Sequence, residues 1–460
     1  MAATQKPSPI PEVFDHLRAE REGTWLRDVY VPPDDFLSVA GPRSYVVFGD
    51  NGAGKTALRI ALQRQAKHRG EAGAPLGVHW IPTQVDGEAR DIVQEVFKQL
   101  MDACARELLD YAYRYPDRLR SAKPWAQQAT AWFTQTYLRG NFEFELDKLD
   151  DQFEGGNIEG VKALLSQSSS PILPANSPAP SVIAQLASTV RSLGADGIRI
   201  YVDGMEALAE QDKAALVKIV KAILSTLALF EEPGFTFKML TLSEIKNDLL
   251  KDNSALRRRW DVYGLKWSSA QLRAMVEKRA QAALGKGAYQ LKDLYAPEEL
   301  LDRLEKIGGG SPRGWLELIR PLLEHQQAKK ESAPLSSKEF AEACAKNPPP
   351  LRIDLHGDKV YIGYGEVHGL QPLTKKILYY VYAQENRACT REELYYKANL
   401  GLDRVPASSK DDNWVGRPQW EKSVDTAVYR IRQVIEPNPK QPIYLITDAG
   451  KSIVRLENTW

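Results

Sequence analysis

Short apolar runs alternate with amphipathic stretches along the first part of this 460-residue chain. The apolar runs lie between turn signals and predict buried strands at residues 44–48, 77–82, 198–202, 235–242 and 262–265. Apolar residues at helical spacing predict helices between these runs. Strands that alternate with helices are typical of a parallel sheet. The pattern therefore predicts an α/β fold.

Breaks in this pattern suggest a division of the chain into five parts. The parts are a lead-in at residues 1–40, a core at 41–267, a helical domain at 268–330, a linker at 331–350 and a final domain at 351–460. Within the core, residues from about 85 to 195 form a helical insertion that ends in a Ser- and Pro-rich loop. Such a stretch is long for a connection between two strands, and its role is left open.

The final domain has a different pattern. Short strands are predicted at 351–355, 359–362 and 367–370, separated by Gly and Asp turns. Three helices follow, of which the last has Val424, Val428, Ile431 and Ile435 as its buried stripe. Apolar residues on both sides of Gly450 predict a closing hairpin. The domain is thus predicted to be α+β.

The main chemical signal is a glycine-rich loop between the first strand and the helix that follows it. Its residues are Gly49, Asp50, Asn51, Gly52, Ala53, Gly54, Lys55, Thr56 and Ala57. The order fits G-x-x-x-x-G-K-[ST], in which backbone N–H groups and a helix N-terminus bind phosphate. Lys55 is expected to reach the outer phosphates, and the Thr56 hydroxyl to bind Mg²⁺. The predicted cofactors are ATP and Mg²⁺.

Acidic residues follow the strand at 198–202. Asp203 comes directly after it, where a carboxylate of a P-loop sheet faces the nucleotide's magnesium. Glu206 lies two residues beyond the position that a water-polarising acid usually takes, which Gly204 occupies. Glu206 is therefore either a general base or a solvated turn residue.

Three further positions suggest phosphate chemistry. Ser243 ends the fourth strand and is either a γ-phosphate sensor or a helix N-cap. Arg257, Arg258 and Arg259 are either a solvated helix end or the source of an arginine that acts on a neighbour's nucleotide. Arg313 follows Pro312 at the start of a helix, where a cation opposes the helix dipole. A phosphate contact is the favoured interpretation of Arg313.

Composition excludes several other classes. A net charge of +1 provides no overall attraction to nucleic acid or membrane. Three separated cysteines and six scattered histidines provide no disulfide framework and no metal cluster. The N-terminus has no apolar signal core, and the longest apolar stretch contains lysines. We expect a cytoplasmic protein without a membrane partner.

The order of these motifs resembles that of the AAA+ and STAND ATPases over residues of about 25–330. This resemblance implies a P-loop core with a helical lid, ATP hydrolysis and ATP-dependent self-association. Hydrolysis is expected to be slow, because no acid directly follows Asp203. Lys55, Asp203 and Glu206 would be catalytic, Ser243 (or Thr241) would be sensor 1, and Arg313 would be sensor 2. One of Arg257–Arg259 would be an arginine finger that acts on the neighbouring subunit.

Residues 351–456 resemble the winged helix-turn-helix of the OmpR/PhoB response regulators. The similarity rests on the small leading sheet, Leu370-Gln371-Pro372, TREEL at 390–394 and VDTAVYRIR at 424–432. By position, Lys422, Thr426, Ala427 and Tyr429 would face DNA bases, Arg430 and Arg432 would reach phosphates, and Lys451 would lie in the wing.

The charge of this domain departs from that family. It has 16 Lys and Arg against 14 Asp and Glu, and Asp448 lies in the wing. Three functions therefore remain open for the nucleotide-dependent switch. The leading one is DNA binding, and the first alternative is recruitment of a protein effector. A third is a loader ATPase of the replication or transposition kind.

Overall fold

The computed structural model describes residues 19, 26–68, 73–85, 87, 89–138, 140–153, 158–166, 172–174, 177–226, 232–251, 260–284, 289–294, 305, 307–329, 333–346, 348–355, 357–448 and 452–459. Contacts divide the chain into two compact units. Unit 1 contains residues 1–31, 52–54 and 266–460, and unit 2 contains residues 32–51 and 55–265. The helical domain and the final domain, which the sequence separates by a linker, thus belong to one unit.

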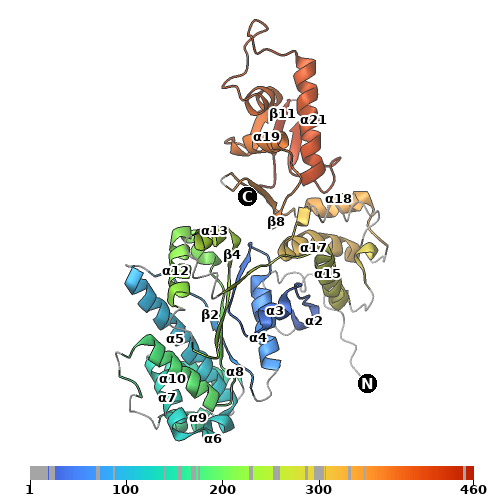
Figure 1. Cartoon of the computed structure of the whole chain (residues 1–460). Helices are drawn as coiled ribbons and strands as arrows, with labels where there is room; N and C mark the ends of the chain where they lie inside the picture. The colour runs from blue at the N-terminus through green and yellow to red at the C-terminus, as the bar shows by residue number, and fades with distance from the viewer. Residues whose placement is uncertain are drawn as a thin grey trace. The chain divides into compact units, whose positions relative to one another are not determined.

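Unit 2 is built on a five-stranded sheet in which all neighbouring strands are parallel. In chain order the strands are β1 (Tyr45–Gly49), β2 (Leu76–Trp80), β3 (Ile198–Val202), β4 (Phe235–Leu242) and β5 (Asp261–Gly264). The order across the sheet is β2-β3-β4-β1-β5, so β4 lies between β1 and β3 (Figure 1). The predicted α/β class is confirmed, and every predicted strand of the core is present.

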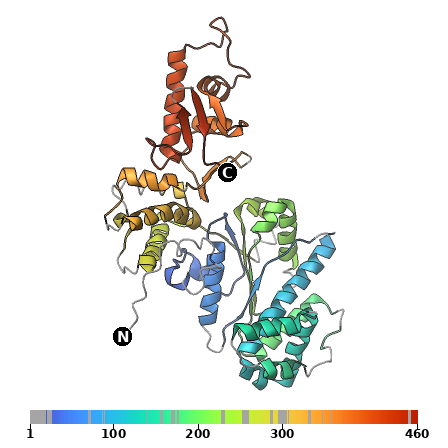
Figure 2. The ribbon, with the colours of Figure 1, turned by 180° about the vertical axis from the view of Figure 1, so that it is seen from behind.

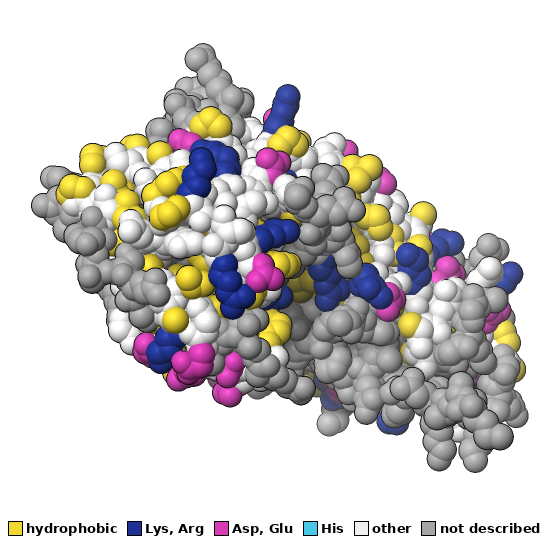
Figure 3. Space-filling view, turned by 90° about the horizontal axis from the view of Figure 1, so that it is seen from below, with side chains coloured by type: hydrophobic (Ala, Val, Ile, Leu, Met, Phe, Trp, Pro, Cys, Tyr) yellow, Lys and Arg dark blue, Asp and Glu magenta, His cyan; other side chains and the backbone are white. Residues whose placement is uncertain are grey.

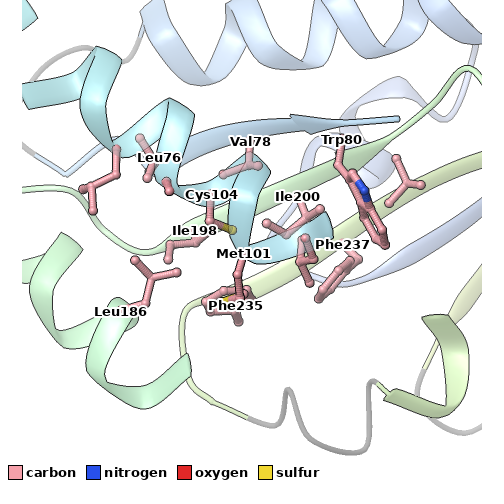
Figure 4. Packing of buried hydrophobic residues seen from close by; sticks show 14 of the residues in the cluster. Leu76, Val78, Trp80, Met101, Cys104, Leu186, Ile198, Ile200, Phe235 and Phe237 are labelled. Carbon is pink, nitrogen blue, oxygen red and sulfur yellow. The ribbon is translucent and has the colours of Figure 1, made fainter. Parts of the chain in front are cut away.

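One face of this sheet carries the main hydrophobic core. Side chains alternate between faces along a strand, and Ile198, Ile200 and Val202 all point to this face. Figure 4 shows Met101 and Cys104 packed among strand residues here. These residues belong to a helical layer that comprises α5 (Ala89–Arg114), α10 (Ala179–Ser192) and α12 (Lys213–Thr226). Apolar burial on this face stabilises the sheet by roughly 25 cal/mol per Å².

The opposite face is covered by α4 (Lys55–His68), the helix that follows the glycine-rich loop. Tyr201 alternates with the core residues of β3, and its hydroxyl donates to the Leu62 carbonyl oxygen of α4 at 3.3 Å. Asp203 is two residues after Tyr201, so its side chain lies on the same face of the sheet as Tyr201. Its carboxylate is therefore directed towards α4. This geometry decides which residues meet at the carboxyl edge of the sheet.

The predicted insertion is a helical bundle between β2 and β3. Besides α5 and α10 it contains α6 (Pro116–Ser121), α7 (Pro124–Leu138), α8 (Phe142–Gln152) and α9 (Ile158–Ser166). The Tyr111 hydroxyl donates to the Leu193 carbonyl oxygen, and Arg191 pairs with Glu232 just before β4. The end of α5 and helices α6–α10 therefore gather at the amino ends of the strands (Figure 2). This part of the bundle lies at the edge opposite to Asp203.

In unit 1, helices come first in the segment that starts at residue 266. They are α15 (Ser269–Leu284), the 3-10 turn Leu291–Asp293, α17 (Pro312–Ala328) and α18 (Ser337–Lys346). Their apolar faces share one core with the final domain, in which Trp315 and Leu351 are both at most 1% exposed. A continuous core explains why the two regions form one unit.

The final domain has two antiparallel sheets and three helical segments. The strands are β6 (Leu351–Asp354), β7 (Lys359–Ile362), β8 (Gly365–Glu366), β9 (Ala388–Thr390), β10 (Leu445–Asp448) and β11 (Ile453–Leu456). The helical segments are α19 (Pro372–Ala383), α20 (Arg391–Glu393) with the π-helical turn Leu394–Asn399, and α21 (Arg417–Ile435). One prediction is wrong: the third strand is β8, not residues 367–370, because Gly363 (φ 54°) allows the chain to reverse immediately after β7.

The described surface shows no single dominant charge on the face drawn in Figure 3. Basic side chains there are interspersed with acidic and hydrophobic ones. Among the helices that the structure describes, none has both the length and the apolarity needed to cross a membrane.

Candidate functional site

The glycine-rich loop has the geometry that its sequence predicts. β1 ends at Gly49 and α4 begins at Lys55. Gly52 and Gly54 have φ angles of 79° and 84°, which only glycine adopts without strain. Asp50 is exposed, while Asn51, Thr56 and Ala57 are half-buried. Strand, loop and helix together have the arrangement of a phosphate-binding loop.

Lys55 is held inside this loop. Its side chain is 4% exposed, and its ammonium donates to the carbonyl oxygens of Gly49 and Asp50, each at 3.0 Å. Glu206 Oε1 lies 2.9 Å from the same nitrogen. The three oxygens satisfy all three N–H donors of the lysine. An incoming phosphate therefore has to replace at least one of them.

Glu206 is the first residue of α11 (Glu206–Gln211). Its contact with Lys55 gives it a third role, beside the general base and the turn residue that its sequence position suggests. Gly204 has a φ of 78°, and a Cβ there would lie 3.1 Å from the Ile81 side chain. An acid directly after Asp203 would thus need strained backbone, which explains the glycine at that position.

Asp203 forms a buried ion pair that sequence reasoning missed. Arg59 Nε lies 3.0 Å from Asp203 Oδ2, and the side chains are 7% and 2% exposed. Arg59 also donates to Gln63 Oε1 at 2.6 Å. Arg59 is one helical turn after Lys55 on α4, so the two cations face the same edge of the sheet. The sequence signal that could have indicated this pair is a basic residue four positions after the loop lysine.

His79 lies beside this pair on β2, in register with Tyr201 of β3. The pKa of His79 is lowered from 6.5 to about 4, chiefly by burial and also by the Arg59 charge, while Asp203 opposes the change. The imidazole is therefore neutral near pH 7. No pattern in the apolar run around His79 indicated this neighbourhood.

Two buried oxygens at this edge have no hydrogen-bond partner among the described residues. They are Asp203 Oδ1 and Thr241 Oγ1, in side chains that are at most 2% exposed. Thr241 is in register with Phe48, one residue before the glycine-rich loop. Buried polar atoms normally have partners, so these two oxygens have the capacity to bind a ligand. Thr241 was the alternative to Ser243, which begins a 3-10 turn and is half-buried.

The residues present fit magnesium. Mg²⁺ prefers oxygen ligands and is commonly held by one or two protein oxygens together with phosphates. Thr56 and the unpartnered Asp203 oxygen have this chemistry. Among the described residues no cluster of three or more His, Cys, Asp or Glu could hold a metal alone.

Gly52–Gly54 belong to unit 1. Ser311 caps α17 by accepting from Gly314 N, and its hydroxyl donates to the Gly52 carbonyl oxygen at 3.2 Å. The Arg313 backbone N–H donates to the same oxygen at 3.3 Å. Trp267 Nε1 donates to the Ala53 carbonyl oxygen at 2.7 Å. The Arg313 backbone is thus close to Gly52, and its phosphate contact stays a prediction.

The DNA-reading candidates of α21 separate into two groups. Lys422, Thr426, Tyr429 and Arg430 are exposed on one face of the helix. Ala427 is 7% exposed and lies in the hydrophobic core, so a base-facing position for it is wrong. Arg432 donates to the Leu445 carbonyl oxygen and to Thr447 Oγ1, at 2.9 and 2.7 Å. Arg257, Arg258, Arg259 and Lys451 lie outside the described residues.

Comparison with known proteins finds distant similarities to solved structures. No protein-family model matches the chain, and no curated protein matches it. Solved structures that match include the ORC2 protein of Aeropyrum pernix in ADPNP and ADP complexes, at 13% identity and a TM-score of 0.37, over 100% of this chain and 93% of that one. The ORC1 protein of the same organism in complex with DNA has 14% identity and a TM-score of 0.37, over 98% and 94%. Cdc6p of Pyrobaculum aerophilum has 10% identity and a TM-score of 0.33, over 100% and 93%.

The fold class follows from the chain's own geometry. A parallel sheet, a glycine-rich loop between β1 and α4, and an acid at the end of β3 are consistent with a P-loop NTPase α/β fold.

Proposed function

We propose that the chain is an ATP-dependent molecular switch of the AAA+/STAND type. It binds ATP with Mg²⁺ at the glycine-rich loop and transmits the nucleotide state to its C-terminal domain. The observation that carries this proposal is the pair of buried groups at the carboxyl edge of the sheet. Lys55 is 4% exposed, and Asp203 is 2% exposed with one oxygen unpartnered.

Within this proposal the residues have distinct tasks. Lys55 binds the outer phosphates as a point charge, and the loop N–H groups surround the phosphate oxygens. Thr56 and Asp203 hold Mg²⁺, which neutralises charge on the phosphates. Thr241, or Ser243, is a sensor at the end of β4. Arg313 donates its guanidinium N–H groups to the γ-phosphate and so distinguishes ATP from ADP.

Hydrolysis is slow in this proposal. No acid directly follows Asp203, and Glu206 is engaged by Lys55 at 2.9 Å. A general base has to be within hydrogen-bond reach of the attacking water, so Glu206 can act only after the lysine has moved to the phosphate. This order suits a switch, which needs a long-lived ATP state.

Nucleotide binding to the Lys55→Ala variant tests the proposal. Loss of the lysine removes the main charge on the phosphates and should weaken ATP binding by orders of magnitude. Lys98, an exposed lysine on α5, provides the matched control Lys98→Ala. Equal thermal stabilisation of Lys55→Ala and the parent by ATP contradicts the proposal.

Self-association is the proposed means of switching. Arg257, Arg258 and Arg259 would supply an arginine to the nucleotide of a second copy, since a guanidinium on a desolvated phosphate is a strong contact. The triple alanine variant should bind ATP normally but fail to assemble, as light scattering with a non-hydrolysable ATP analogue can show. A parent protein that stays monomeric at saturating analogue, with DNA also present, contradicts this step.

The C-terminal domain is proposed as a winged helix that docks on a partner, and its charges favour a protein over DNA. Arg391 pairs with Glu421 and Asp425 of α21, at 3.3 and 3.0 Å. Arg432 is bonded to β10. DNA affinity comes mainly from cations that neutralise phosphates. Arg391 and Arg432 already have partners within this chain. The exposed face of α21 also carries Tyr429, which is 60% exposed.

Duplex DNA of random sequence separates the alternatives. A DNA-binding regulator should bind it with an affinity that falls steeply as salt increases. A loader of the replication or transposition kind should form ATP-dependent rings or filaments on it. The protein-docking switch that we favour should do neither.

A further inference from the structure

Tyr364 belongs to the turn between β7 and β8, yet it lies beside the glycine-rich loop. A Cβ placed on Gly52 would be 3.0 Å from Tyr364 Cβ and 3.1 Å from Arg313 Cβ. These residues of unit 1 are more than 250 positions away from Gly52 in the sequence. A residue of the final domain thus touches the loop next to the arginine expected to read the nucleotide.

The contact between Tyr364 and Arg313 has a defined geometry. The Arg313 guanidinium carbon lies 4.4 Å from the centre of the Tyr364 ring. A ring face attracts the flat face of a guanidinium, whereas phosphate is bound by the N–H groups at the edge of that group. Ring and phosphate therefore use different parts of the guanidinium, and the ring can orient the arginine without blocking its ligand.

The turn that carries Tyr364 is held against the start of α17 by facing glycines. A Cβ on Gly314 would be 2.9 Å from Gly365 N, and a Cβ on Gly309 would be 2.7 Å from the Glu366 carbonyl oxygen. Such backbone-to-backbone approach leaves no room for any side chain. Figure 1 shows β8 beside α17, as these distances require.

Glu317 adds a polar link at the same place. It lies one helical turn after Arg313 and accepts a hydrogen bond from the Tyr364 backbone N–H. Its carboxylate also lies against Gly363, where it occupies the space that a Cβ would need. One turn of α17 thus contacts both the ring and the backbone of Tyr364, so ring and arginine should keep their mutual position when either moves.

We propose that Tyr364 is a positioning residue of the nucleotide site, which orients Arg313 for the γ-phosphate and ties that contact to the final domain. The inference rests on the proposed function, since it needs Arg313 to bind ATP. It assigns the β7–β8 turn as the element through which the C-terminal domain senses the bound nucleotide.

The test is the ratio of ATP to ADP affinity in the full-length chain. Tyr364→Leu removes the ring but keeps an apolar side chain, and should lower ATP affinity by roughly 3- to 30-fold while changing ADP affinity little. Tyr364→Phe keeps the ring face and should restore the parent ratio. Tyr361→Leu is the matched control, because Tyr361 forms a similar contact with Arg352 at 4.5 Å.

Combination with Arg313→Ala makes the test specific. Tyr364→Leu should have no further effect on the ratio in the Arg313→Ala background, because the ring acts through that arginine. Equal losses for ATP and ADP, failure of Tyr364→Phe to restore the ratio, or additive effects in the double variant would each overturn the inference. The proposed function fails separately, through unchanged ATP binding in Lys55→Ala.

Discussion

Arg59 and Asp203 join the helix after the glycine-rich loop to the end of β3, with 3.0 Å between Nε and Oδ2. The pair is almost fully removed from water. In such surroundings the attraction between the charges offsets their desolvation only while both are present. The magnesium ligand expected from the sequence is therefore neutralised by the protein itself, and this has consequences for stability, metal binding and titration.

Removal of one partner should destabilise the fold. Arg59→Met leaves a buried, uncompensated carboxylate and should reduce the free energy of unfolding by about 3–5 kcal/mol. The double variant Arg59→Met, Asp203→Leu should recover most of that loss. Denaturant unfolding measures both. The exposed pair of Arg106 and Asp102 is the control, since breaking it should cost about 0–1 kcal/mol. Equal costs for the two pairs would contradict the buried-pair account.

Arg59 should also set the magnesium requirement for ATP binding. Arg59→Gln removes the cation that competes for Asp203, so we expect half-maximal ATP binding at a Mg²⁺ concentration lower by about threefold or more. Asp203→Asn should abolish the Mg²⁺ dependence. Titration with a fluorescent ATP analogue at varied Mg²⁺ gives both values. Gln63→Ala, which removes only the other partner of Arg59, is the control. An unchanged Mg²⁺ requirement in Arg59→Gln would show that the pair does not compete with the ion.

Glu206 should restrain nucleotide binding through Lys55. Glu206→Gln keeps the size of the side chain but removes a negative charge that lies 2.9 Å from the lysine nitrogen. ATP affinity should therefore rise several-fold, because the lysine no longer has to leave an ion pair. Calorimetric titration measures it, with Glu210→Gln at an exposed position of the same helix as control. A fall in affinity would instead place Glu206 among the groups that bind ATP. Turnover in the same variant tests the general-base role, which predicts slower cleavage.

His79 should titrate near pH 4, well below a free histidine. The unfolded chain takes up this proton near pH 6.5 and the folded chain near pH 4, so stability should fall as pH decreases through that window. His79→Gln should flatten the pH dependence there. Arg59→Gln should raise the pKa, because it removes a neighbouring cation. NMR titration of the imidazole measures the pKa. A His79 pKa near 6.5 in the parent would contradict the buried neighbourhood described for it.

The local signals of this chain were enough to predict its sheet and its loop. Residues 198–202 and 235–242 form strands with the predicted bounds. A short apolar run between turn residues is typical of a buried strand. The loop from Gly49 to Thr56 is also a local feature, since its glycines, its lysine and the helix start are adjacent in sequence. Asp203 follows β3, and parallel strands present their carboxyl ends at one edge, so its place near the loop was predictable.

Contacts between distant segments decided the rest. Arg59 meets Asp203 only because α4 covers the face to which odd-numbered residues of β3 point. Thr241 rather than Ser243 has a buried, unpartnered oxygen, a distinction set by strand register and by the 3-10 turn that follows. The third strand of the final domain was misplaced for a similar reason. A tight turn at Gly363 depends on backbone conformation, which the apolar pattern around Val367 does not report.

What the sequence determined by itself was the set of chemical groups: a glycine-rich loop with a lysine, a carboxylate at a strand end and an arginine at a helix start. Each depends on neighbours within a few positions, where propensity and periodicity act. Only the tertiary structure decided which groups restrain that chemistry. Glu206 on Lys55, Arg59 on Asp203 and Tyr364 on Arg313 are all contacts between separate elements. Such pairings depend on how helices pack on sheets and on how closely two glycines approach each other. Neighbouring residues in the sequence contain no signal for either.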